Sequence, residues 1–328
     1  MFGLAGLGGL YLLDYRLLMR HAGKIYIAAL MLGFLTWQFG PRVNHAAWHT
    51  RHVVLLYPAV YAIWMNHCRN KGWKGFFLAV LGGIPLAMIA CMAPYIMGLF
   101  LLLGTGMILL LLAAGEDWFG IGRKETAFSV LGCSLTVGIL AVCYGWNEWV
   151  TRRISMLLYP EKDPFGSGYQ ILSVRNMLSG ARWQGAASVA PAYGDHPYEY
   201  IVPEWSGDFL LTTIACKLGW LFFLLTAVLM LVLFGWIVGR AFRQRNPFGR
   251  LLAVGAVLPM LLETVGAIAQ NLGYYLVSVP IPVFSGNINM VMTMALLGLA
   301  LSALRQQDLP EMCETMPRTK WKLVLVRE

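Results

Sequence analysis

The sequence has 328 residues, of which 58% are hydrophobic and only 12% charged, and its mean hydropathy is +0.63. Soluble domains average about 45–50% apolar and about 25% charged residues, so this composition excludes an ordinary soluble globular protein. The 35 glycines and 12 tryptophans are typical of membrane helices, in which glycine is frequent and aromatic residues gather at the interfaces. We therefore predict an all-α, polytopic integral membrane bundle.

A helix needs about 20 apolar residues to cross about 30 Å of hydrocarbon. Nine apolar runs approach this length, the first of them short: residues 1–13, 25–39, 53–66, 75–92, 95–114, 126–144, 209–238, 251–270 and 283–304. One hydrophilic stretch interrupts them. We predict N-terminal membrane spans (1–145), a long extracellular loop (146–208), C-terminal membrane spans (209–305) and a cytoplasmic tail (306–328).

The positions of the cations decide what the net charge of +9 means. On the predicted spans, 17 of the 25 lysines and arginines fall on one face of the membrane and 7 on the other. Lysine and arginine collect on the cytoplasmic side of membrane proteins. The sequence therefore predicts a multi-pass membrane protein with a cytoplasmic C-terminus. Membrane lipids are expected partners, and the basic excess needs no nucleic acid to explain it.

Asp208 stands where the hydrophilic loop turns into the apolar run 209–238. One interpretation is a helix N-cap, because aspartate at this position accepts a hydrogen bond from a free backbone N–H. The other is catalytic, since a carboxylate held at a membrane mouth can act as a general base toward a sugar hydroxyl. The local sequence leaves both open.

Three further residues of the polar segments suit a phosphate-bearing or sugar-bearing amphiphile. Arg152 and Arg153 are adjacent, and paired arginines bind pyrophosphate oxygens bidentately. Trp48 offers a ring on which a sugar can stack. Interfacial anchoring explains the arginines equally well and is the more common role of such a tryptophan.

Lys217 and Glu263 are ionisable residues inside predicted spans, where charge is costly unless it is paired or faces water. Counting along each helix places both roughly 12–13 Å below the outer surface. We therefore predict that they pair or share one hydrated cavity. Three histidines cluster in residues 45–52, but no acidic ligand lies close by, so no metal site is predicted.

The sequence RRISMLLYPEKDPFGSGYQ at residues 152–170 resembles a loop motif, RRI…PEKDPxGxGYQ, of one family of membrane proteins. Residues 205–219 are similar to that family's TDFIF…EELG segment, which puts Asp208 on the family's essential carboxylate. A further match lies earlier, at residues 39–48, and two more lie later, at residues 271–273 and 280–285. The family is SEDS (shape, elongation, division and sporulation), of the FtsW, RodA and SpoVE type.

The resemblance implies a ten-helix fold in the plasma membrane of a bacterium. It also implies a peptidoglycan glycosyltransferase that acts on lipid II, an undecaprenyl-pyrophosphate-linked precursor, beside a class B penicillin-binding protein. A sugar 4-hydroxyl would attack the donor's anomeric carbon with inversion, and Asp208 would be the base or would hold a metal. A divalent cation, Mg²⁺ or Mn²⁺, suits such a leaving group, but no ligand cluster in the sequence assigns one. The residues expected to bind substrate are Arg152, Arg153, Gln170, Trp48, Ser285 and Asn271.

Departures from the family pattern fall where the family keeps polar groups inside the bundle. Its QPSEFAKL is YPAVYAIW at residues 57–64, and its QPDLG is APYIM at residues 93–97. The family's first span and part of its second have no counterpart. Two alternatives therefore stay open. One is a transporter (flippase) of lipid-linked precursors, for which Lys217 and Glu263 would be the telling residues, and the other is a non-catalytic scaffold for a penicillin-binding protein.

Overall fold

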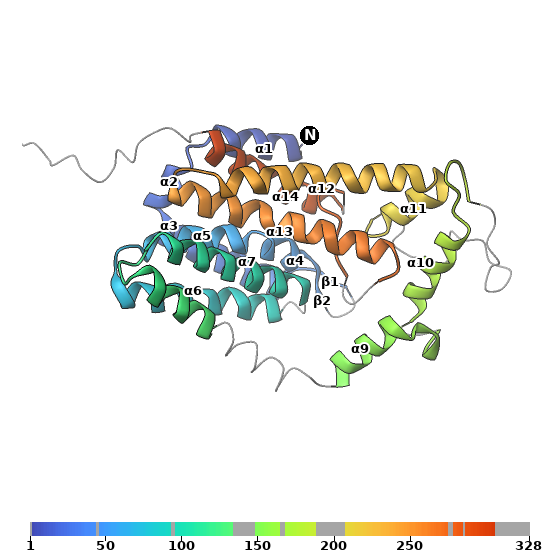
Figure 1. The fold of residues 1–328 in the computed structure, drawn as a ribbon, viewed down its shortest axis with the longest axis horizontal. Helices are drawn as coiled ribbons and strands as arrows, with labels where there is room; N and C mark the ends of the chain where they lie inside the picture. Colours follow the sequence, from blue (N-terminus) through green and yellow to red (C-terminus); the bar gives the residue numbers. More distant parts are fainter. Residues whose placement is uncertain are drawn as a thin grey trace, which may run out of the picture.

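The computed structural model describes residues 2–43, 46–92, 96–133, 148–164, 168–187, 207–274, 278–284 and 286–305. Within these residues, six helices are long and apolar enough to cross a membrane. They are α3 (Ala22–Phe39), α6 (Gly72–Met92), α7 (Ile96–Gly115), α12 (Trp220–Phe242), α13 (Pro247–Asn271) and α14 (Gly286–Arg305). Figure 1 shows these helices aligned with the long axis of the molecule, and the predicted all-α polytopic bundle is confirmed.

Shorter elements complete the described fold. They are α1 (Phe2–Leu12), α2 (Arg16–Arg20), β1 (Arg42–Val43), β2 (Ala46–Ala47), α4 (Trp48–Val54), α5 (Tyr57–His67), α9 (Glu148–Leu158), the 3-10 turn η1 (Pro160–Lys162), α10 (Tyr169–Ser179) and α11 (Leu210–Lys217). Strands β1 and β2 form a two-residue antiparallel hairpin, with Arg42 opposite Ala47. Residues 123–133 are also helical.

Helix α13 is the centre of the bundle. It packs against α5, α7, α12 and α14, and most of its length is buried. Helix α12 lies at the edge and exposes large apolar side chains, among them Leu225, Leu229 and Trp236. In a membrane protein such a face contacts lipid, so α12 is a boundary helix while α13 is enclosed by protein.

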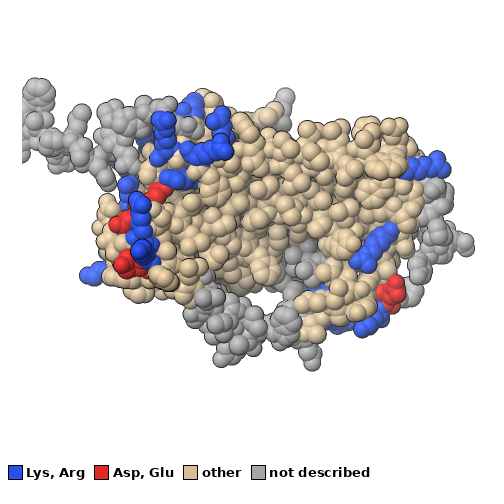
Figure 2. All heavy atoms as spheres, viewed as in Figure 1, with Lys and Arg blue, Asp and Glu red and all other residues tan. Residues whose placement is uncertain are grey.

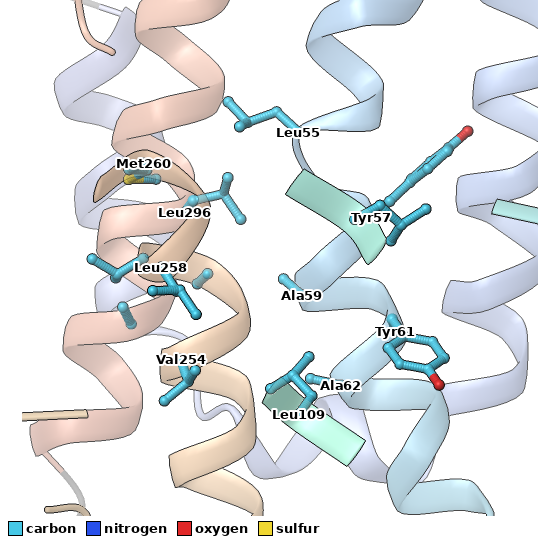
Figure 3. Close-up of a cluster of buried hydrophobic side chains, with 14 of the residues drawn as sticks. Leu55, Tyr57, Ala59, Tyr61, Ala62, Leu109, Val254, Leu258, Met260 and Leu296 are labelled. Atoms are coloured by element: carbon cyan, nitrogen blue, oxygen red, sulfur yellow. The ribbon is translucent and has the colours of Figure 1, made fainter. Parts of the chain in front are cut away.

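A cluster of buried apolar side chains joins α5, α7, α13 and α14 (Figure 3). Figure 3 shows Ala62 and Leu109 between α5 and Val254 of the central helix, while the ring of Tyr61 points away from α13, and all four residues are 3% exposed or less. Because lipid tails are as apolar as these side chains, burial from water does not hold the helices together here. The close packing of many atom pairs supplies the stabilisation instead.

One of the spans predicted in the first half of the chain differs from the structure, and another cannot be compared along its whole length. The span expected at residues 53–66 is divided between α4 and α5, with a turn at Leu55 and Leu56. Pro58 lies in the first turn of α5, where its missing N–H costs no hydrogen bond. The span expected at residues 126–144 lies partly outside the described residues.

The predicted continuous span at residues 209–238 is wrong. The chain forms α11, stops at Leu218 and Gly219, and starts again as α12. Gly219 has φ +106°, and a Cβ at this position would lie 2.6 Å from the carbonyl oxygen of Trp183. Only glycine fits this conformation and this close approach. The hydropathy of the run therefore hides a break set by backbone geometry.

The cations gather at one end of the bundle, seen as the blue end on the left in Figure 2. Four helix ends lie at this end of the bundle: the start of α6, the end of α12, the start of α13 and the end of α14. The lysines and arginines at or next to these helix ends are Lys71, Lys74, Arg240, Arg243, Arg245, Arg250 and Arg305. We call it the basic end. The opposite end, where α11 meets the C-terminal turn of α13, is the α11 end. This separation agrees with the one-sided charge distribution expected from the sequence.

Candidate active site

Asp208 lies at the α11 end, in the turn that leads into α11. Its side chain is 4% exposed, although it stands at the end of the bundle. The hydroxyl of Ser278 donates a hydrogen bond to Oδ2 of Asp208 at 3.2 Å. Ser278 follows α13 and is itself exposed, so the carboxylate sits directly beneath a surface group.

The N-terminus of α11 is capped by another element. Its N-cap residue is Phe209, whose side chain makes no hydrogen bond to the first turn of the helix. Instead, Oδ1 of Asn271 accepts hydrogen bonds from the backbone N–H of Thr212 at 2.9 Å and from its hydroxyl at 3.0 Å. A free N–H of the first helical turn is thereby satisfied. The cap bond described for this turn thus comes from Asn271, and the interpretation of Asp208 as a helix cap stays a prediction.

Asn271 uses its whole side chain inside the protein. Its Nδ2 group donates to the carbonyl oxygens of Asp208 at 2.9 Å and Ala267 at 2.8 Å, and the residue is completely buried. The prediction that Asn271 binds substrate is therefore wrong. A side-chain amide has two N–H donors and one oxygen acceptor, and here all of them bind the protein. Asn271 fixes the Asp208 turn to the last residue of α13.

Gln270, the residue before Asn271, binds the backbone on the other side of the turn. Its Oε1 accepts a hydrogen bond from the backbone N–H of Val279 at 2.7 Å, and the side chain is 1% exposed. Val279 follows Ser278, so Gln270 positions the segment whose hydroxyl binds Asp208. Sequence reasoning missed Gln270. A Gln-Asn pair at the end of an apolar run was the available signal, because buried amides need partners.

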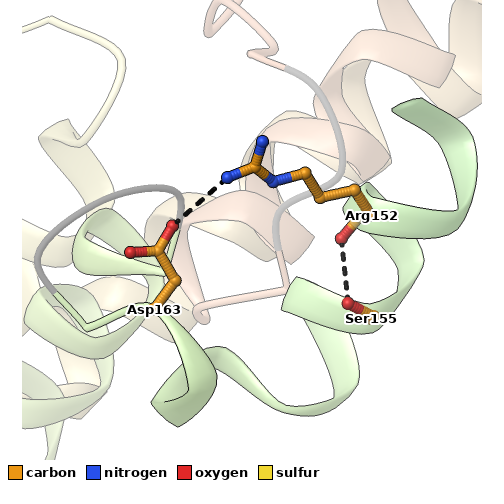
Figure 4. Close-up of polar contacts among 3 residues, drawn as sticks. All are labelled: Arg152, Ser155 and Asp163. Carbon is orange, nitrogen blue, oxygen red and sulfur yellow. Dashed lines mark hydrogen bonds and ion pairs between the residues drawn. The ribbon is translucent and has the colours of Figure 1, made fainter. Parts of the chain in front are cut away.

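Arg152 lies on α9 and is far from this turn. Figure 1 shows α9 well apart from α11, with α10 between them. Figure 4 shows the guanidinium of Arg152 facing Asp163. Nη2 of Arg152 lies 3.8 Å from Oδ2 of Asp163. The Arg152 side chain is 69% exposed, and so open an ion pair contributes little to stability. Arg153 follows on the same helix and is half-buried.

The other residues predicted to bind substrate either lie on separate elements or fall outside the part of the chain that the structure describes. Gln170 is the second residue of α10 and is half-buried. Trp48 is the first residue of α4, and its side chain lies outside the described part of the structure, as does Ser285. Their predicted roles stay predictions.

Lys217 and Glu263 do not lie at equal depth in two spans, as the sequence suggested. Lys217 is the exposed last residue of α11 and precedes the spanning helix α12. Glu263 is 1% exposed and lies inside α13, two turns before Asn271. The premise of the proposed pair is therefore wrong, because the break at Gly219 takes Lys217 out of the span.

Arg175 is a second residue that sequence reasoning did not single out. It projects from α10 and donates hydrogen bonds from Nε to the carbonyl oxygen of Gly273 at 3.3 Å and from Nη2 to that of Leu157 at 3.4 Å. Its guanidinium also lies over the ring of Tyr274, 5.4 Å from the ring centre. Arg175 thus joins α9 and α10 to the turn after α13.

These features define a class: a helical membrane bundle that holds a buried carboxylate at one end and carries arginines on the separate helices α9 and α10 at that end. Residues 3–309 match the model of the family described as cell cycle protein, FTSW_RODA_SPOVE. The chain belongs to the FtsW/RodA/SpoVE family, as the resemblance of its loop motifs predicted.

Two curated relatives show how much of the chain is shared. The probable peptidoglycan glycosyltransferase FtsW of Thioalkalivibrio sulfidiphilus is 27% identical over 263 residues, which cover 76% of this chain and 61% of that protein. The peptidoglycan glycosyltransferase MrdB of Escherichia coli K12 is 26% identical over 230 residues, covering 68% of this chain and 58% of that protein. The match therefore spans about three fifths of each relative.

Solved structures share the fold. A chain from a peptidoglycan synthase complex that coordinates polymerization and crosslinking has a TM-score of 0.68 at 18% identity, covering 94% of this chain and 87% of that one. A mutant of the rod shape determining protein RodA from Thermus thermophilus has a TM-score of 0.59 at 15% identity, covering 94% and 86%. At these identities the likeness shows the bundle architecture.

Proposed function

We propose that this protein is an inverting peptidoglycan glycosyltransferase that polymerises lipid II, with Asp208 as its catalytic carboxylate. The observation that carries the proposal is the placement of Asp208, a carboxylate 4% exposed at the end of the bundle and held by Ser278 and Asn271. A general base must be fixed against the proton it takes. The names of the two relatives, both peptidoglycan glycosyltransferases, support the same chemistry.

In the proposed reaction, the 4-hydroxyl of the acceptor sugar lies against Asp208. The carboxylate accepts the hydroxyl proton while the oxygen bonds to the donor's anomeric carbon from the side opposite the leaving group. The bond from that carbon to undecaprenyl pyrophosphate breaks, so the configuration is inverted. Ser278 and Asn271 keep the carboxylate in place during this transfer.

Negative charge develops on the pyrophosphate as it leaves, and cations stabilise it. Arg152 and Arg153 are the proposed cations, because guanidinium groups bind phosphate oxygens in pairs. Both lie on α9, apart from α11, so this role requires a substrate long enough to contact both parts of the α11 end.

The divalent cation expected from the resemblance stays a prediction, for which Asp208 is the candidate ligand. Within the described residues, no three side chains of His, Cys, Asp or Glu are grouped so that they could hold a metal. The Ser278 hydroxyl donates a hydrogen bond to the Asp208 carboxylate and is not a second negatively charged oxygen beside it. Every step proposed above therefore uses the chain's own residues.

We also propose a class B penicillin-binding protein as the partner, because a similar fold occurs in a peptidoglycan synthase complex. The protein is a multi-pass membrane protein, and we propose that its basic end and its C-terminus face the cytoplasm. A C-terminal fluorescent protein should then be bright, and alkaline phosphatase fused at the same point should be inactive. The reverse pattern would contradict the orientation.

The decisive experiment is polymerisation of labelled lipid II by the purified protein, with and without the co-purifying penicillin-binding protein. Wild type should produce glycan strands, and Asp208→Asn and Asp208→Ala should not, while each variant keeps the wild-type unfolding temperature. No strands from a folded, partner-bound wild type would contradict the proposal. Transport of labelled precursor across vesicle membranes would then identify a flippase. If neither polymerisation nor transport is observed, the scaffold role is the one that remains.

A further inference from the structure

Arg175 occupies the junction of three segments that are distant in the sequence. It comes from α10, it binds Leu157 in the last turn of α9, and it binds Gly273 in the turn that ends α13. We call α9, η1 and α10 (residues 148–164 and 168–179) the α9–α10 arm. Arg175 connects this arm to the helix whose last residue, Asn271, holds the Asp208 turn.

The two acceptors of Arg175 are carbonyl oxygens at helix C-termini. Such carbonyls have no partner within their own helix, and the aligned peptide dipoles make the C-terminal end of a helix negative. One cation between two of these ends satisfies both. Tyr274 adds a third contact, because the guanidinium lies over its ring.

The turn after α13 is shaped to receive this side chain. Gly273 has φ +81°, and its N–H binds the carbonyl of Gln270 while the N–H of Tyr274 binds that of Ala269, which closes the helix end. A Cβ at position 273 would lie 2.7 Å from Cγ of Arg175. Glycine therefore serves both the backbone and the approach of Arg175.

We infer that Arg175 is a positioning residue that couples the α9–α10 arm to the Asp208 turn. It acts on Asp208 through Gly273 and Asn271, and on Arg152 through the last turn of α9. The inference rests on the proposed function in one respect, because Asp208 is the proposed base and Arg152 the proposed pyrophosphate ligand. The positions of these two residues relative to each other can be measured whether or not the protein has that activity.

The chemistry of the guanidinium makes the inference testable. Arg175 uses two diverging N–H groups for its two carbonyl acceptors and a planar face for the ring of Tyr274. Lysine keeps the positive charge but has neither the two fixed N–H directions nor the planar group. Arg175→Lys should therefore behave like Arg175→Ala. If Arg175 acted instead as a simple positive charge for the pyrophosphate, lysine would restore function and alanine would raise KM.

The first readout is a distance that does not depend on activity. Native cysteines are replaced in the full chain, and spin labels are attached at Leu158→Cys on α9 and Leu221→Cys on α12, both exposed positions. With Arg175 present, one narrow distance distribution is expected. Both Arg175→Lys and Arg175→Ala should broaden it, whereas Arg182→Ala, an exposed arginine near the start of α12, should not.

The second readout is turnover of lipid II, for which we expect both Arg175 variants to lose about 10- to 100-fold in kcat, as misplacement of a catalytic group does. An unchanged distance distribution, or wild-type kcat in Arg175→Lys, would overturn the inference. If wild type makes no glycan strands, the proposed function fails, and the distance experiment alone then decides the coupling.

Discussion

Oδ1 of Asn271, at the end of α13, accepts a hydrogen bond from the backbone N–H of Thr212 in the first turn of α11. The same side chain donates to the backbone carbonyl of Asp208. One amide thus binds both the first turn of α11 and the turn that carries Asp208. The backbone of the Asp208 turn is anchored by Asn271, separately from the bond that the Asp208 carboxylate accepts from Ser278.

Replacing Asn271 tests this separation. Asn271→Ala leaves the N–H of Thr212 and the carbonyl of Asp208 without their present partner, and each buried group left unpaired costs about 1–3 kcal/mol. We expect a lower unfolding temperature and a loss of lipid II polymerisation greater than that loss of stability explains. Asn287→Ala, at an exposed position at the start of α14, is the control and should change neither.

The break between α11 and α12 should be intolerant of a side chain. At φ +106°, Gly219→Ala adds backbone strain and brings a Cβ against Trp183 and Gln184, which we expect to cost about 1–3 kcal/mol. Gly235→Ala is the matched control, because among the described residues a Cβ there meets nothing within 4 Å. Thermal unfolding in detergent compares them, and equal midpoints would contradict the prediction.

Glu116 gives the basic end a pH-dependent contact. It pairs with Arg250, but burial raises the pKa of the Glu116 carboxyl above its usual value of 4.5, against the opposing effect of Arg250. Stability from a group whose pKa is raised on folding is present below the usual pKa and is lost as the pH rises through the raised one.

The unfolding temperature of wild type, relative to Glu116→Gln, should therefore fall as the pH rises from 4.5 toward neutrality. Glutamine keeps the size and a hydrogen-bonding oxygen but does not titrate. A difference that grows with pH in favour of wild type would show that the attraction of Arg250 outweighs the burial of the carboxylate.

The thiol of Cys216 should react more slowly with alkylating reagents than an ordinary cysteine thiol. Burial raises the pKa of Cys216 to about 11, and its Sγ donates a weak hydrogen bond to the carbonyl of Met177 on α10. Because the thiolate is the reactive form, alkylation near pH 8 should be about 100-fold slower than at an ordinary thiol. Peptide mapping after iodoacetamide measures this, and labelling as fast as that of a free thiol peptide would refute it.

The sequence was sufficient for the features that repeat over many residues. Hydropathy located the spanning helices because the bilayer demands about 20 apolar residues from each. The motif around Asp208 located the candidate carboxylate, and the one-sided cations matched the basic end. These properties are local to a segment or are averaged over it.

Features that depend on one backbone angle or one long-range contact escaped prediction. The run at residues 209–238 stays apolar through Gly219, so hydropathy could not register the break that removes Lys217 from the span. Asn271 and Thr212 are 59 positions apart, and Arg175 and Gly273 are 98 apart. Only the folded chain shows that an expected ligand, Asn271, is a structural amide.

The pairing of α1 with α14 has a consequence for biosynthesis. The two helices pack together, and the hydroxyl of Ser302 binds the carbonyl of Leu13 at 2.6 Å. Chains grow at about 5–20 residues per second, so α1 is made roughly 15–60 s before its partner reaches the membrane. During that interval α1 lies among lipids or against an insertase, and this pair of helices forms only when α14 arrives.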